Sequence, residues 1–113
     1  MHELGLTKNV IDLVAKEAEK SGFTRTLEIR MKLGEYSDVV PEYIVDLFPR
    51  AAKGTAAEGA QLLFERVPGC FRCPDCGYEG LVDRHEAKCP GCGGIALKMT
   101  AGREFFVESL KVE

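Results

Sequence analysis

Two short stretches of the sequence repeat the pattern Cys-Pro-x-Cys-Gly, and this repeat constrains the fold more than any other feature. The stretches are residues 73–77 and 89–93, with twelve residues between Cys76 and Cys89. The two-residue gap in each pair lets both thiolates reach one metal ion, and the glycine that follows permits the positive φ that a tight turn can need. Two such turns facing each other predict a closed four-sulfur zinc site. The predicted zinc ligands are Cys73, Cys76, Cys89 and Cys92.

Two other side chains of this segment could bind metal, and we leave both out of the predicted site. Cys70 and Cys73 are also spaced Cys-x-x-Cys, but their stretch lacks the proline and the glycine of the repeat. We therefore interpret Cys70 as a small residue at a hinge. His85 lies between the two pairs, and four thiolates leave no need for it, so we interpret it as a surface histidine. A zinc ion held by four thiolates has no open position for substrate, which predicts a structural role.

The composition is that of a small globular protein. The 113 residues are 45% hydrophobic and 29% charged, with a net charge of −3, which argues against a disordered chain. No apolar run approaches the roughly 18 residues of a membrane span, and the amphipathic first twenty residues are unlike a signal peptide. We therefore expect no membrane association and a cytoplasmic location. In that reducing compartment, cysteines crowded into residues 70–92 favour metal binding over disulfides.

The charge of the cysteine segment argues against nucleic acid as a partner. Between Gly69 and Leu97 the sequence carries three cationic and four acidic side chains. A zinc tetrathiolate adds about two further negative charges. Because phosphate binding needs an excess of positive charge, we expect this segment to be structural or to contact protein.

Hydrophobic periodicity predicts two helices. Residues 3–21 carry apolar side chains at three- and four-residue steps and stop before Gly22, as an amphipathic helix does. Its predicted buried stripe is Leu6, Val10, Leu13, Val14 and Ala18. A second helix begins at Pro41, and Gly54 marks its latest end. We expect Pro49 to kink or shorten this second helix, because its ring clashes with the carbonyl four residues back.

Three strands complete an α+β domain in the prediction. Residues 25–33 alternate between apolar and polar side chains, and residues 61–67 and 104–112 form the other two strands. The predicted fold is a small three-stranded sheet with two helices, plus a zinc ribbon inserted between the second and third strands. The predicted domains are residues 1–68 with 98–113, and the ribbon 69–97. The ribbon is too small to be stable through apolar burial alone, so it needs the metal.

The amino terminus, Met1-His2-Glu3, offers a second kind of metal chemistry. The α-amine of Met1, the backbone nitrogen of His2 and its imidazole can chelate one ion through adjacent rings. Nitrogen donors in a plane suit Ni(II) or Cu(II). Glu3 could add its backbone nitrogen or its carboxylate, and Asp38 and Glu42 are further candidate oxygen donors.

Taken together, these features resemble the HypA/HybF family of hydrogenase nickel-incorporation proteins, and the resemblance covers the whole chain. It rests on the Met1-His2-Glu3 start and the paired cysteines, together with Gly34-Glu35 and Ala57-Glu58-Gly59. The resemblance implies a nickel metallochaperone that is not an enzyme, with His2 as a ligand of transient Ni(II). It also implies structural Zn(II) on the two cysteine pairs. Some members carry histidines beside these pairs, where this chain has Gly77 and Gly93-Gly94, so we expect no exchange of histidine for cysteine at the zinc.

The resemblance also implies partners. Members of the family work with a nickel-associated GTPase and deliver nickel to the large subunit of [NiFe]-hydrogenase and, in some organisms, to urease. The amino-terminal helix region is the implied docking surface. The sequence leaves the oligomeric state open between monomer and dimer.

Two other functions compete with this interpretation. One is a zinc-ribbon adaptor that binds protein or RNA, in which His2 has no role. The other is a thiol–disulfide enzyme, which the sequence disfavours because the paired cysteines lack a thioredoxin-like βαβ context.

Overall fold

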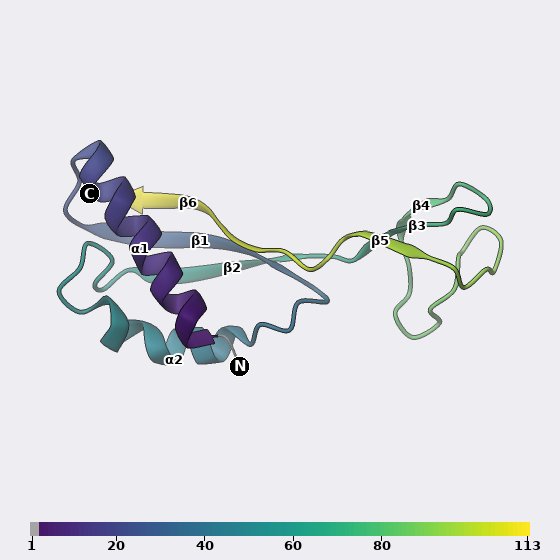
Figure 1. Ribbon diagram of the computed structural model, residues 1–113, viewed down its shortest axis with the longest axis horizontal. Coiled ribbons are helices and arrows are strands. Elements are labelled where there is room, and N and C mark those ends of the chain that lie inside the picture. The colour runs from purple at the N-terminus through teal and green to yellow at the C-terminus, as the bar shows by residue number, and fades with distance from the viewer. Residues whose placement is uncertain (1–2) are drawn as a thin grey trace. The chain divides into compact units, whose positions relative to one another are not determined.

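The computed structural model describes residues 3–113, which form two helices and two small sheets (Figure 1). The helices are α1 (Glu3–Ser21) and α2 (Pro41–Ala52). The strands are β1 (Thr26–Gly34), β2 (Gln61–Val67), β3 (Cys70–Arg72), β4 (Glu79–Leu81), β5 (Lys98–Ala101) and β6 (Phe105–Val112). One sheet has the order β2-β1-β6 and the other β4-β3-β5. The predicted class, α+β with a three-stranded sheet and two helices, is confirmed. Neither helix is long and apolar enough to cross a membrane.

Helix α1 has the predicted bounds but buries a different face. Val10 and Val14 are buried as expected, whereas Leu13 is 40% exposed. The buried stripe is Glu3, Thr7, Val10, Ile11 and Val14. Apolar periodicity could not identify this face, because two of its members are polar. Glu3 and Thr7 can be buried because each side chain makes a hydrogen bond within the protein.

Helix α2 continues through Pro49, so of the two expected effects of this proline, a kink or a shorter helix, the shortening is wrong. The helix runs three residues further, to Ala52. Pro49 has no N–H, so the carbonyl of Val45 loses its helical partner. Pro49 and Val45 both lie on the exposed side of the helix, where water can replace that bond. On the opposite side Phe48 and Ala52 are buried, and their burial offsets the cost.

The central strand β1 holds the core of the larger sheet. Its side chains alternate, with Ile29 and Met31 buried on one face and Glu28, Arg30 and Lys32 on the other. In Figure 1, β1 lies between β2 and β6, and α1 crosses in front of the sheet. The other buried apolar residues of this core are Val10, Ile11, Val14, Ile44, Phe48, Ala52 and Ala57.

Ion pairs on the polar face of this sheet join β1 to both edge strands. The ammonium of Lys32 lies 2.7 Å from the Glu65 carboxylate of β2 and 3.1 Å from that of Glu108 on β6. These bonds, with Glu65 first, raise the pKa of Lys32. The three charges join all three strands of the sheet, which favours the pairing of β1 with both edge strands.

The described residues divide into two compact units. The first contains the described residues up to Lys32, together with Val39–Glu65 and Phe106–Glu113. The second contains Leu33–Asp38 and Arg66–Phe105. The predicted domains, residues 1–68 with 98–113 for nickel binding and residues 69–97 as the inserted zinc ribbon, stay a prediction.

The second unit contains the ribbon sheet β4-β3-β5. Strand β3 pairs antiparallel with both neighbours, with Phe71 opposite Gly80 of β4 and Met99 of β5. The register of the β3–β5 pair shifts between Cys70 and Phe71. Such an irregularity bends the strand at the point where the ribbon begins.

Three glycines of the second unit let backbone segments pass each other closely. The N–H of Gly34 donates to the carbonyl of Glu104 at 2.7 Å, and that of Tyr36 donates to the carbonyl of Gly102 at 2.7 Å. A side chain on Gly34 would overlap the carbonyl of Gly102, and one on Gly69 would overlap the ring of Tyr36. The obstacle to a side chain at Gly34 is backbone, which cannot move aside as a flexible side chain could.

Candidate metal centre

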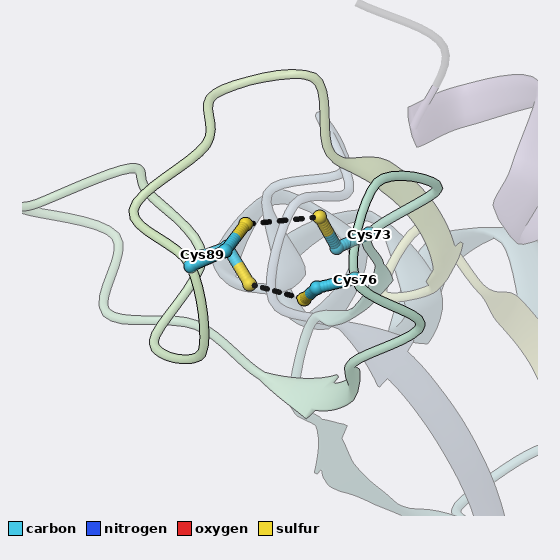
Figure 2. A group of neighbouring side chains, drawn as sticks. Cys73, Cys76 and Cys89 are labelled. Carbon is cyan, nitrogen blue, oxygen red and sulfur yellow. Dashed lines mark hydrogen bonds between the residues drawn. The ribbon is translucent and has the colours of Figure 1, made fainter.

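The structure brings the sulfurs of Cys73, Cys76, Cys89 and Cys92 within 4.8 Å of one another. The Cys73 and Cys92 sulfurs are 3.6 Å apart, and the Cys76 and Cys89 sulfurs are 3.5 Å apart. Figure 2 shows Cys73 and Cys76 on one turn, with their sulfurs directed toward the turn that carries Cys89. Four sulfurs about 2.3 Å from a tetrahedral metal would lie about 3.8 Å apart. The observed spacing is therefore close to that of a metal tetrathiolate.

The two Cys-Pro-x-Cys-Gly turns have the same backbone structure. In the first, the N–H of Gly77 donates to the carbonyl of Cys73 at 2.9 Å, and in the second that of Gly93 donates to the carbonyl of Cys89 at 2.8 Å. Gly77 has φ +79° and Gly93 φ +76°. These are left-handed values that favour glycine, so the conformational reason given for the glycine of the repeat is confirmed.

A second backbone hydrogen bond closes each turn, and the sequence could not predict it. The N–H of Cys73 donates to the carbonyl of Tyr78, and that of Cys89 donates to the carbonyl of Gly94, both at 2.8 Å. Tyr78 and Gly94 differ in side chain but occupy equivalent places in the two turns. Because the bond is between backbone atoms, residue type gives no signal of it.

Backbone N–H groups also point at the sulfurs of the second turn. Gly91 donates to the sulfur of Cys89 at 3.3 Å, and Gly94 donates to that of Cys92 at 3.4 Å. Such donors stabilise negative charge on a thiolate. In each pair the first cysteine is buried and the second is exposed, so the site has one inner and one outer side.

The thiols of the group differ in acidity. Burial raises the pKa of Cys89, but hydrogen bonds from the N–H groups of Cys92 and Gly91 bring it down to about 7. The backbone of Tyr78 lowers the pKa of Cys76, but the sulfur of Cys89 and burial outweigh this and raise it to about 12. A metal bound to all four sulfurs must displace such protons, so its affinity falls as the pH falls.

Cys70 and His85 lie outside this group of four. Cys70 begins β3, where it is half-buried and paired with Leu81 of β4 and Ala101 of β5. His85 is exposed, and its backbone N–H donates to the carboxylate of Asp83 at 2.8 Å. The structure thus gathers the four cysteines of the repeat and leaves the fifth in the sheet.

Arg84, in the loop between the cysteine pairs, makes contacts that the sequence analysis missed. Its guanidinium lies 3.7 Å from the carboxylate of Glu35 and 5.3 Å from the ring centre of Tyr36. The other oxygen of Glu35 accepts the N–H of Gly69 at 2.8 Å. The Tyr36 ring meets Phe71 edge to face, with ring centres 5.7 Å apart. These contacts hold the loop against the turn that follows β1.

The amino-terminal candidates are only partly within the described residues. Met1 and His2 lie outside them. Glu3 is the first residue of α1, and its carboxylate accepts the N–H of Val40 at 3.1 Å. Glu42 is exposed in the first turn of α2, and Asp38 lies in the loop before that helix.

Comparison with known proteins points to one family. The family model described as "Hydrogenase/urease nickel incorporation, metallochaperone, hypA" matches residues 1–112. The chain is 39% identical to the hydrogenase maturation factor HypA of Geobacter sulfurreducens over 113 residues, covering 100% of both chains. It is 34% identical to the factor of the same name from Chlorobium luteolum over 113 residues, covering 100% of this chain and 97% of that one.

Two solved structures share the fold. The solution structure of the Ni metallochaperone HypA from Helicobacter pylori matches with a TM-score of 0.72 and 21% identity, covering 99% of this chain and 97% of that one. A second structure, described as the solution structure of HypA protein, matches with a TM-score of 0.78 and 21% identity. It covers 100% of this chain and 97% of that one.

Proposed function

The chain belongs to the HypA family of hydrogenase/urease nickel-incorporation metallochaperones, and from this premise we propose that it binds Ni(II) at its amino terminus and delivers it for the maturation of [NiFe]-hydrogenase. The observation that carries the proposal is the family match over residues 1–112, which includes the Met1-His2-Glu3 start. The family acts in metal delivery and enzyme maturation, not in catalysis.

The proposed resident metal is Zn(II), held by Cys73, Cys76, Cys89 and Cys92. Two features support zinc: an all-sulfur donor set, and sulfur spacings near those of a tetrahedral site. When bound, zinc would supply a structural link between the two turns. The N–H groups of Gly91 and Gly94 would offset part of the negative charge on the sulfurs.

Nickel is the proposed cargo, and its proposed donors are nitrogens. They are the Met1 amine, the backbone nitrogen and imidazole of His2 and, less centrally, Glu3. Deprotonated amide nitrogens and neutral imidazole nitrogens suit Ni(II), whereas thiolates suit Zn(II), so the two metals would occupy chemically distinct sites. Nickel could then be loaded and released without removing zinc. Asp38 and Glu42 remain candidate oxygen donors.

The proposed partners follow from the same premise. They are the nickel-associated GTPase of hydrogenase maturation and the hydrogenase large subunit, with urease as a further target in some organisms. The protein would act in the cytoplasm, as a monomer or a dimer.

Hydrogenase maturation in a host that lacks its own family member tests the delivery role. The wild-type chain should restore hydrogenase activity, and His2→Ala should not, because the imidazole is lost. The matched control is His85→Ala, which removes the only other histidine of the 113 residues and should restore activity fully. Hydrogenase activity and the nickel content of the large subunit are the readouts.

Restoration by His2→Ala at wild-type level would contradict the proposal. It would favour the competing function, a zinc-ribbon adaptor in which His2 has no role. Exposed apolar side chains on the second unit, Ile95 at 84% and Leu81 at 57%, are the observation in favour of an adaptor.

A further inference from the structure

The carboxylate of Glu3 is buried at the start of α2. Glu3 is the first residue of α1, yet only 5% of it is exposed. One oxygen of its carboxylate accepts the N–H of Val40 at 3.1 Å, across 37 positions of sequence. Burying a carboxylate is costly unless hydrogen bonds compensate, so this contact accounts for part of the stability of the arrangement.

Helix α2 lacks a cap of its own at this point. Val40 is the residue before its first turn, with φ −99° and ψ 105°, and its side chain makes no capping bond. In a capping box, a glutamate three residues into the helix accepts the N–H of that preceding residue. Here the third residue of the helix is Tyr43, which has no carboxylate. Glu3 supplies the acceptor from another helix, and its charge is favoured near the positive end of α2.

The backbone of Glu3 is held as well as its side chain. The hydroxyl of Thr7 donates to the carbonyl of Glu3 at 2.6 Å, and Thr7 is fully buried. Two hydrogen bonds therefore hold Glu3 in the first turn of α1. Thr7 donates to its backbone carbonyl, and Val40 donates to its side-chain carboxylate. The residue that directly precedes this fixed point in the sequence is His2.

We propose that Glu3 is a positioning residue for nickel, and that its carboxylate acts by holding the N–H of Val40. This inference rests on the proposed function, in which Met1 and His2 hold the ion. The bond to the N–H of Val40 supplies the acceptor at the start of α2 and ties the residue that follows His2 to a second helix. A carboxylate that keeps that bond fixes the point at which the chelating peptide leaves α1, so less ordering is needed when nickel binds.

Two substitutions of Glu3 separate positioning from ligation. In Glu3→Gln the amide oxygen can still accept the N–H of Val40, but the negative charge is gone. In Glu3→Ala the acceptor is gone too. We expect Glu3→Gln to bind nickel within about threefold of wild type and Glu3→Ala to bind about tenfold more weakly, as when a supporting partner of a metal ligand is lost. Asp12→Asn, which removes an exposed charge from the same helix, is the matched control and should bind as wild type does.

Three readouts decide the result: nickel affinity, the visible absorption spectrum of the nickel form, and hydrogen exchange at the Val40 amide. Positioning predicts one spectrum for all variants, with Val40 protected in wild type and Glu3→Gln and exposed in Glu3→Ala. A changed spectrum, with Glu3→Gln as weak as Glu3→Ala, would overturn the proposal, and so would equal Val40 protection in all variants. If Glu3→Ala fails to fold, the affinity and spectrum of Glu3→Gln decide alone. Nickel binding that survives His2→Ala would instead overturn the proposed function.

Discussion

Cys73→Ser should lose bound zinc and the ordered structure of the second unit, whereas Cys70→Ser should keep both. The buried apolar residues of the described chain explain why. In the second unit they are Leu33, Cys73 and Cys89, so two of the three are members of the proposed zinc site. We therefore expect a unit with so little apolar core to depend on the proposed zinc, since zinc contributes an apparent ~10–16 kcal/mol in small zinc domains.

Cys70→Ser is a matched control because Cys70 and Cys73 form the alternative Cys-x-x-Cys pair. Zinc content by atomic emission and a two-dimensional amide NMR spectrum give the readout. The expected result for Cys73→Ser is less than one zinc per chain, collapsed resonances for residues 66–105, and dispersed resonances for α1 and α2. If Cys70→Ser lost zinc and Cys73→Ser retained it, the ligand assignment would be wrong.

Adding two glycines before Met1 should weaken nickel binding by more than about a hundredfold. The added residues move the α-amine away from His2 and convert the nitrogen of Met1 into an amide, so one proposed donor is lost while all 113 residues remain. A single glycine would not serve, because a histidine at position three lets the amine, two amide nitrogens and the imidazole chelate Ni(II) in one plane. Loss of a supporting partner costs a metal site about 10–100-fold, and loss of a direct ligand should exceed that. Zinc content should not change, because the cysteine turns are untouched.

The matched control is two glycines added after Glu113, which change the chain length equally and should leave nickel affinity unchanged. Affinity is measured by competition with a chelator of known nickel affinity, near neutral pH. Unchanged affinity after the amino-terminal addition would remove the Met1 amine from the proposed ligands. Nickel would then need other donors beside His2, with Asp38 and Glu42 as the candidates.

The features that the sequence predicted well are local ones. The strand 25–33 was predicted from strict alternation and is observed as Thr26–Gly34, with Ile29 and Met31 buried. The two cysteine turns were predicted because cysteine spacing and the following glycine report a conformation that only a few residues determine. In each case the signal and the structure it describes lie within the same ten residues.

The features that the sequence could not predict depend on distant residues. The buried face of α1 includes Glu3, whose partner Val40 belongs to the start of α2. Pro49 stays inside α2 because Phe48 and Ala52 are buried beyond it. Gly34 is needed because Gly102, far along the chain, passes against it. No local pattern reports such pairs, and one sequence alone cannot reveal them.

Calorimetric titration of Ni(II) into zinc-loaded protein with a free amino terminus tests the central claim most directly. Wild type, His2→Ala and His85→Ala are compared near neutral pH, with zinc content measured before and after. Two separate metal sites predict one nickel equivalent for wild type and His85→Ala, its loss in His2→Ala, and unchanged zinc in all three. Equal nickel binding by His2→Ala and wild type would contradict the account, because nickel would then bind elsewhere.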